Sequence, residues 1–256
     1  MSKRPAHNQI KLWAVVFWLL VWQIASMALD RALDVNLLLP SPISALLRLG
    51  ELALTASFWQ AVARSFLRIV GGFLLSCFAA SLLAVPASRW QRVRELLGPP
   101  VAAVKAVPVA SFIILALFWL DSRSLTLFIS FLMVFPPVYL NVLEGIRQTD
   151  EKLLEMARIF RVPLWRQIRG IYMPAVMPYF RTAVSLGLGL CWKAGVAAEV
   201  IGLPMGSVGE MLYNSKVYFM TSDLFAWTTV IVVVSILFEK LFLYLMDAVM
   251  RKAGVK

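Results

Sequence analysis

Residues 65–85 read SFLRIVGGFLLSCFAASLLAV and decide the fold class of this chain. They carry a single charge, Arg68. A helix of about 20 apolar residues crosses the hydrocarbon core of a bilayer, which is about 30 Å thick. Within lipid, every backbone N–H and C=O must be paired inside the protein, and a helix pairs them within its own segment. The stretch therefore predicts a membrane-spanning helix.

Further stretches of the chain are long and apolar enough to cross a bilayer in the same way. They are Leu12–Leu29, Val101–Leu120, Leu125–Val142, Ala175–Leu203 and Leu224–Met246. The 256 residues are 61% hydrophobic and 15% charged, whereas a soluble domain has about 45–50% apolar and about 25% charged residues. We predict an all-α membrane protein with six transmembrane helices, forming a single domain over residues 1–256. The first run is too long for a cleaved signal peptide, so we interpret it as a retained helix.

The basic residues predict the orientation, because short cytoplasmic loops are enriched in Lys and Arg. With the N-terminus inside, most basic residues fall on the cytoplasmic side. These are Lys3, Arg4, Lys11, Arg89, Arg92, Arg94, Arg147, Lys152, Arg158, Arg161, Arg166, Arg169, Arg251, Lys252 and Lys256. Both termini are therefore predicted to be cytoplasmic. The net charge of +11 reflects this topology, and not the basic stripe of a soluble nucleic-acid-binding domain.

An external segment of about residues 30–57 separates the first two spans. Ser41 can cap a helix with Pro42 in its first turn. The stretch Ile43–Ala56 is mostly apolar but broken by Arg48 and Glu51, so we predict a helix lying on the outer face of the membrane.

Prolines interrupt two predicted spans. Pro99, Pro100 and Pro108 punctuate the third span, and Pro136 and Pro137 interrupt the fourth. Broken backbone pairing persists in lipid only against protein or a water-filled cavity. Both spans are therefore candidates for lining a path, and a plain packing kink is an equally good interpretation.

The cytoplasmic loop of about residues 144–173 is too polar to span and is patterned as two short helices. The first has an apolar face formed by Leu153, Leu154, Ala157 and Phe160. Pro163 can start the second, in which Leu164, Ile168 and Ile171 share one side. The pattern suits an element on which a partner pushes, and it also suits a solvated amphipathic loop with no partner.

A spaced motif within this loop resembles the EAA motif of binding-protein-dependent ATP-binding cassette (ABC) permeases, E-A-A-x3-G-x9-I-x-L-P. Glu155, Ala157, Ile171 and Pro174 match it in register. Three positions depart from it: Met156, Arg161 and Met173.

Four other fragments are similar to the nitrate/sulfonate/taurine-type permease family. They are Leu38-Leu39-Pro40-Ser41-Pro42, Ser65-Phe66-Leu67-Arg68, Thr149-Asp150 and Ala197-Ala198-Glu199. The resemblance covers about residues 37–251 and implies the type I ABC importer permease fold in the bacterial cytoplasmic (inner) membrane. It also implies a homodimer with the translocation path at its interface.

The resemblance implies that the two short helices form a coupling helix, which docks in a cleft of a cytoplasmic ABC ATPase dimer. Glu155, Met156, Ala157, Arg161 and Ile171 would serve this coupling, and Pro174 would end the loop. The family's glycine suits a turn with positive φ. Arg161 therefore indicates either a differently built turn or an added contact to its own ATPase.

The resemblance also implies an extracytoplasmic solute-binding protein as a partner. This chain contains no G-x-x-x-x-G-K-[ST] sequence, so ATP and Mg²⁺ are expected on the partner ATPase and no cofactor on this chain.

The fifth span carries small residues at steps of four, which let helices approach closely. They are Ala183, Gly187, Cys191 and Gly195. We predict that this ridge packs against another helix or a second copy of the chain. The same span contains Lys193 and Glu199, which lie about 120° apart around a helix. Ionisable groups within a span usually face a cavity or a partner, so we predict a translocation path or gate, with structural ion pairs as the alternative.

Catalysis and metal binding have little support. The only histidine is His7, and Cys77 and Cys191 lie in apolar runs. We therefore expect no metal site, no catalytic residue and no enzyme, but the membrane subunit of an importer for a small anionic or polar solute. The alternative is a secondary transporter or channel without an ATPase, which would not require the patterned loop.

Overall fold

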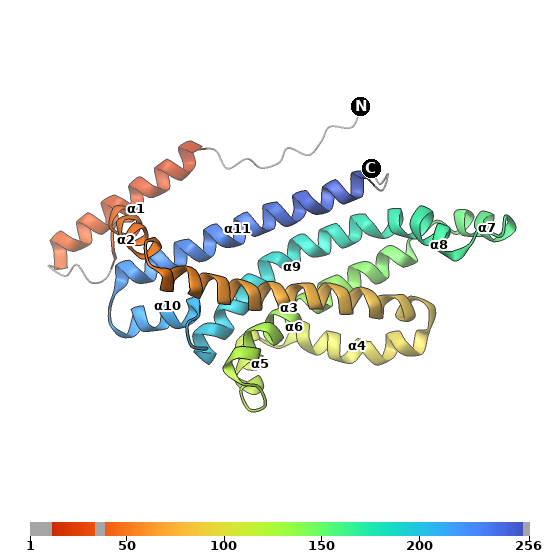
Figure 1. Cartoon of the computed structure of the whole chain (residues 1–256), viewed down its shortest axis with the longest axis horizontal. Helices are drawn as coiled ribbons and strands as arrows, with labels where there is room; N and C mark the ends of the chain where they lie inside the picture. Colours follow the sequence, from red (N-terminus) through yellow and green to blue (C-terminus); the bar gives the residue numbers. More distant parts are fainter. Residues whose placement is uncertain (1–11, 34–38, 253–256) are drawn as a thin grey trace. The chain divides into compact units, whose positions relative to one another are not determined.

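The computed structural model describes residues 12–33 and 39–252, which form helices and their connections with no strand among them (Figure 1). The predictions that rest on Lys3, Arg4, His7, Lys11, Lys256 and on residues 37–38 lie outside the described residues. The helices, in chain order, are α1 (Leu12–Leu33), α2 (Pro42–Ala53), α3 (Ala56–Arg89), α4 (Gln91–Ala106), α5 (Val109–Ala116), α6 (Ser122–Arg147), α7 (Glu151–Ile159), α8 (Leu164–Gln167), a π-helical turn (Ile168–Tyr172), α9 (Met173–Gly202), α10 (Val208–Val217) and α11 (Thr221–Lys252).

The chain forms two compact units. Among the described residues, the first contains 12–33, 39–59 and 211–230, and the second contains 60–210 and 231–252. The helices α3, α10 and α11 each begin in one unit and end in the other. Each unit is described by itself below.

In the first unit, α2 begins where the sequence predicted. The Ser41 hydroxyl accepts a hydrogen bond from the Ser44 backbone N–H at 3.1 Å, and Pro42 occupies the first turn. On the preceding helix, the Trp22 indole donates to the Pro40 carbonyl at 3.1 Å and the Ser26 hydroxyl donates to the Leu39 carbonyl at 2.7 Å. These bonds fix the approach of α1 to α2.

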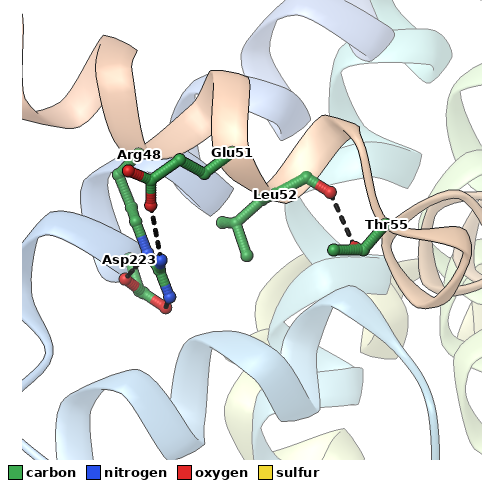
Figure 2. Close-up of polar contacts among 5 residues, drawn as sticks. All are labelled: Arg48, Glu51, Leu52, Thr55 and Asp223. Atoms are coloured by element: carbon green, nitrogen blue, oxygen red, sulfur yellow. Dashed lines mark hydrogen bonds and ion pairs between the residues drawn. The ribbon is translucent and has the colours of Figure 1, made fainter.

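Arg48 on α2 joins this helix to the first turn of α11 (Figure 2). Its Nε and Nη2 donate to the two carboxylate oxygens of Asp223 at 2.6 and 3.1 Å. Its Nη1 donates to Glu51 Oε2 at 2.7 Å. The hydrogen bonds to Asp223 and then Glu51 raise the pKa of the Arg48 guanidinium above its ordinary value. Two nitrogen donors on one carboxylate fix orientation as well as charge.

The second unit has an apolar core shared by α3, α6 and α9. Side chains such as Ile69, Phe73, Val134, Val138 and Val184 are buried there. Glycines allow these helices to approach closely. A Cβ on Gly72 would lie 2.4 Å from the Leu127 carbonyl oxygen of α6. The backbones of α3 and α6 are therefore in direct contact at this position.

The predicted third span over Val101–Leu120 is divided at Pro108, one of the prolines that the sequence places within it. The structure has α4 and α5 in its place, bent by 107°. Pro108 lacks an N–H and disfavours the helical region for the residue before it. Val107 accordingly adopts φ −82° and ψ 133°, an extended conformation that ends α4.

The prolines of the fourth span do not interrupt it. Helix α6 runs without a break through Pro136 and Pro137. The Asn141 side chain donates to the Pro137 carbonyl at 2.8 Å. Neighbouring helices and polar side chains can compensate prolines in this way. The sequence left two interpretations of these prolines, the lining of a path and a plain packing kink, and the unbroken helix α6 does not decide between them.

Within the described residues, four helices are long and apolar enough to cross a membrane: Ala56–Arg89, Ser122–Arg147, Leu164–Gly202 and Thr221–Arg251. The bent pair α4 and α5 makes up to five if it is one span, and the apolar part of α1, Trp13–Leu29, is shorter. The protein is therefore an all-helical, multi-pass membrane protein.

Candidate functional site

Helix α7 is built at both ends by local hydrogen bonds. Asp150 caps its N-terminus, with its carboxylate accepting from the Lys152 N–H at 2.9 Å. At its C-terminus, the Val162 N–H donates to the Ala157 carbonyl at 2.8 Å and the Arg161 N–H donates to the Arg158 carbonyl at 3.1 Å. This pair of bonds is a Schellman motif, which places its C′ residue in the left-handed region.

Arg161 occupies that C′ position with φ 49°. The turn is therefore built as a glycine would build it, and of the two possibilities raised by the sequence, a differently built turn is wrong. A side chain in this conformation costs roughly 1–2 kcal/mol. The Arg161 side chain is exposed.

After Pro163, α8 continues into a π-helical turn, where the Met173 N–H donates to the Ile168 carbonyl. Pro174 lies in the first turn of α9. The predicted two short helices are present, but the second is not separate from the fifth span. Residues Leu164–Gly202 form one continuous helical segment.

The residues of the motif differ in exposure. Glu155 and Met156 are exposed, and Ile171 and Pro174 are half-buried. Ala157 is 2% exposed, so it faces the chain itself and not solvent. Glu155 and Ala157 thus do not share one surface.

Phe160 was predicted to share an apolar face with Ala157, and this was wrong. It is 74% exposed, because α7 ends at Ile159 and the chain reverses at the next two residues. Phe160 belongs instead to a group of exposed apolar side chains that the sequence pattern did not separate from the buried face. We define the coupling patch as Met156, Ile159, Phe160, Leu164, Trp165 and Ile168.

The Glu199 carboxylate on α9 is completely buried, at 0% exposure. The Ser65 hydroxyl of α3 donates to its Oε2 at 2.6 Å, and the Gly209 N–H of α10 donates to the same oxygen at 3.2 Å. The Arg68 guanidinium lies 3.7 Å from Oε1. The fragments Ser65–Arg68 and Ala197–Glu199, which the sequence presented separately, therefore meet in one buried cluster.

Two backbone features close this cluster. The Val208 N–H donates to the Ser65 hydroxyl at 2.9 Å. A Cβ on Gly209 would lie 2.3 Å from the Glu199 Cβ, so only glycine fits there. The chain between α9 and α10 is thus held against α3 at the end of α9.

Lys193 is placed differently from Glu199. Its side chain is exposed, and it forms no salt bridge with any residue in the described part of the chain. Of the two ionisable residues that the sequence indicated in the fifth span, Glu199 is therefore buried in a polar cluster and Lys193 is exposed.

The ridge of small residues on α9 is buried. Ala183 and Cys191 are fully inaccessible. A Cβ on Gly187 would lie 3.1 Å from Val134 Cγ1 of α6, and one on Gly195 would lie 2.6 Å from Ile69 Cγ1 of α3. This ridge packs against helices of the same chain. Among the described residues no group of His, Cys, Asp and Glu could hold a metal ion.

The family model described as "Binding-protein-dependent transport system inner membrane component" matches residues 72–254. The chain belongs to this family. The match includes the coupling patch, α9 and Glu199 of this permease, and it begins just after Ser65 and Arg68.

Curated relatives narrow the type of permease. A "Putative aliphatic sulfonates transport permease protein" of Bacillus subtilis is 31% identical over 77% of this chain and 71% of its own length. A "Taurine transport system permease protein" of Escherichia coli is 26% identical over 85% of this chain and 80% of its own. A "Bicarbonate transport system permease protein" of Synechococcus elongatus is 22% identical over 94% and 89%.

These similarities establish a transmembrane ABC importer permease of the nitrate/sulfonate/taurine type. The apolar helices and this family together establish a multi-pass protein of the bacterial inner membrane. Family members are transport permease subunits and not catalysts.

Proposed function

We propose that this permease is the transmembrane subunit of an importer driven by a separate ABC ATPase dimer, with solute delivered by an extracytoplasmic binding protein. The observation that carries the proposal is the coupling patch. Met156, Ile159 and Phe160 are exposed on α7 and the turn after it, and Leu164, Trp165 and Ile168 are exposed at the start of the Leu164–Gly202 helix. Exposed apolar patches of this kind mark protein interaction sites.

The surroundings of the patch fit a protein partner. Arg158, Arg161, Arg166 and Arg169 are exposed on the same loop, together with Glu155. An apolar centre with a charged rim is the usual anatomy of a protein interface. The Schellman turn at Arg161 and the continuous helix from Leu164 give the element a defined shape, which a push from a partner requires.

We propose six crossings: α1, α3, the bent pair α4 and α5, α6, α9 and α11. The exposed residues Arg89 and Arg92 lie between the second and third crossings, and the basic α7–α8 loop lies between the fourth and fifth. Both loops are cytoplasmic by the distribution of positive charge. An even number of crossings then places both termini in the cytoplasm.

We propose that the solute is a small anion and that Lys193 lies on its path in a homodimer. The exposed Lys193 side chain interrupts an apolar span, and a cation there is costly unless it faces a cavity or partner. Relatives are named for sulfonates, taurine, bicarbonate and nitrate transport. Glu199 lies near the end of α9, which this topology places on the extracytoplasmic side, so Glu199 would hold a gate at the outer end of the path.

Affinity purification of the tagged permease from native membranes tests the assembly. We expect an ATPase subunit to co-purify with vanadate-sensitive activity. Glu155→Lys should reduce its recovery at least tenfold, whereas Glu95→Lys, at an exposed position of α4, should not. A folded permease that never recovers an ATPase would favour the secondary-transporter or channel alternative.

Uptake by reconstituted complexes tests the path. Lys193→Gln should lower uptake of the anion without lowering recovery of the ATPase. Lys240→Gln, which neutralises an exposed lysine of α11, serves as the control. Equal uptake by both variants would remove Lys193 from the path.

A further inference from the structure

A cavity of about 390 Å³ lies between α4 and α6 in the second unit. This volume falls in the roughly 300–1,000 Å³ range of small-molecule sites. Figure 1 places the start of α4 and the end of α6 at the end of this unit from which α7 and α8 extend. The polar residues that line the cavity are Arg94, Lys105, Tyr139, Glu144 and Arg147.

The charge of the lining is positive. The lining contains three cations, Arg94, Lys105 and Arg147, and one carboxylate, Glu144. None of the three cations forms a salt bridge with a residue of the described chain. The Gln148 amide donates to Glu144 Oε1 at 2.7 Å, which occupies one oxygen of that carboxylate. Uncompensated cations on an otherwise apolar wall attract anions, because the low dielectric strengthens their field.

Tyr139 adds an independent sign of a ligand. The residue is 2% exposed, and its hydroxyl has no hydrogen-bond partner among the described residues. Leaving a buried donor unpaired costs about 1–3 kcal/mol. A ligand oxygen in the cavity that Tyr139 lines would accept this hydrogen bond.

We propose that this cavity binds an oxyanion of the phosphate or sulfonate type. Arg94 and Arg147 supply the fork-shaped donors that suit such groups, Lys105 supplies a further charge, and the Tyr139 hydroxyl donates to an anion oxygen. With the orientation proposed above, the cavity opens at the depth of the inner-leaflet headgroups, where basic pockets between helices bind anionic lipids. The oxyanion is then either a phospholipid headgroup or a free cytoplasmic anion.

Binding to the purified chain tests this site without requiring any partner, so its failure is distinguishable from failure of the importer assignment. Native mass spectrometry of the permease with phosphatidylglycerol, and titration with sodium sulfate followed by tryptophan fluorescence or calorimetry, are the two measurements. The double variant Arg94→Gln/Arg147→Gln should weaken binding at least tenfold. Arg92→Gln, an exposed residue of α4 that does not line the cavity, should change it less than twofold.

A steric variant separates occupancy from charge. Gly98 lines the cavity, and a Cβ there meets no atom within 4 Å. Gly98→Leu therefore fills space in the cavity without a clash at the Cβ, and it should weaken the affinity for the bound probe tenfold or more. Gly50→Leu is the matched control, because a Cβ on Gly50 in α2 also meets nothing within 4 Å.

The pattern of losses identifies the source of the anion. If the cavity variants lose phosphatidylglycerol and keep sulfate, the ligand is a lipid headgroup. If they lose sulfate and keep phosphatidylglycerol, the ligand is a free anion. Retention of both probes by folded Arg94→Gln/Arg147→Gln and Gly98→Leu proteins, or equal losses in the two controls, would overturn the proposal. Elution of each variant as a monodisperse peak confirms folding.

Discussion

The hydroxyl of Ser65 lies 2.6 Å from Oε2 of Glu199, although 134 residues separate them in the chain. The same hydroxyl accepts from the Val208 N–H at 2.9 Å. One oxygen atom therefore joins α3, the end of α9 and the start of α10. Such a buried, shared group is expensive to remove, because each partner left behind loses its hydrogen bond.

Ser65→Ala should accordingly destabilise the permease by about 1–3 kcal/mol, because the Val208 N–H loses its acceptor and Glu199 Oε2 keeps only the hydrogen bond from the Gly209 N–H. Thermal unfolding of the purified protein in detergent measures the effect. Ser88→Ala is the control, since that hydroxyl donates only to the Val85 carbonyl of its own helix. Equal shifts in both variants would show that the cluster adds nothing beyond helix propensity.

Adjacent glycines of α3 should respond oppositely to alanine. A Cβ at Gly72 meets the Leu127 carbonyl oxygen at 2.4 Å and the Phe131 nitrogen at 3.0 Å, both backbone atoms of α6. A Cβ at Gly71 meets only the Leu127 Cδ1 at 3.6 Å. We expect Gly72→Ala to cost about 1–3 kcal/mol as an overpacked variant.

Gly71→Ala should instead be neutral or stabilise by up to about 1 kcal/mol, because alanine is the better helix former. Unfolding curves of the two variants, measured side by side, decide this. A Gly71→Ala protein as unstable as Gly72→Ala would contradict direct backbone contact between α3 and α6.

The backbone and side-chain roles of Arg161 can be separated by two substitutions. Arg161→Gly relieves the positive φ and removes the guanidinium, whereas Arg161→Ala removes the guanidinium and keeps the strain of roughly 1–2 kcal/mol. If Arg161 contacts the ATPase, both variants should lose recovery of that subunit. Protection of α7 from proteolysis should increase only in Arg161→Gly, because the native arginine and alanine carry the same strain. Full recovery of the ATPase by both variants would show that the guanidinium makes no contact on which docking depends.

The pairing of Arg48 with Asp223 should contribute modestly and without pH dependence in the ordinary range. Arg48 is 40% exposed and Asp223 is 16% exposed, so a double-mutant cycle of Arg48→Gln and Asp223→Asn should give less than about 1 kcal/mol, reduced by salt. Arg123→Gln, at an exposed position, should leave the unfolding temperature unchanged.

The sign of the pH dependence follows from the raised pKa of Arg48. A group whose pKa is raised on folding contributes fully below its unfolded pKa and loses that contribution as pH rises through the folded value. Arginine titrates above about 12, so the coupling energy should not change from about pH 6 to about pH 9. A decline within that window would indicate that another group controls the contact.

The sequence was sufficient wherever a local pattern controls the structure. Hydropathy located the long helices, and Ser41 with Pro42 located the start of α2. Spacing also located α7 and the start of α8 after Pro163. In each of these places the residues that determine the element lie within a few positions of one another.

Features that depend on distant segments were not accessible in that way. Pro108 was recognised as a break, but its 107° bend also involves the packing of α5 against α6 and α9, in a core that contains Ile113, Ile129 and Ala198. Phe160 does not lie on the same face as Ala157, because α7 ends at Ile159, one residue before the helical spacing would have included Phe160. No periodicity links Glu199 to Ser65, so the buried cluster was visible only as two unrelated fragments.

In the proposed coupling, the uninterrupted helix from Leu164 to Gly202 would act as a lever arm. At 1.5 Å per residue, about 50 Å separate Leu164 in the coupling patch from Glu199 in the buried cluster. With the cluster as fulcrum, a tilt of about 10° would sweep the cytoplasmic end through about 9 Å by this same length. The π-helical turn at Ile168–Tyr172 is the point along this helix where the hydrogen-bond register changes. Bending at this turn would reduce the part of a partner's movement that rotates the membrane-spanning part of the helix.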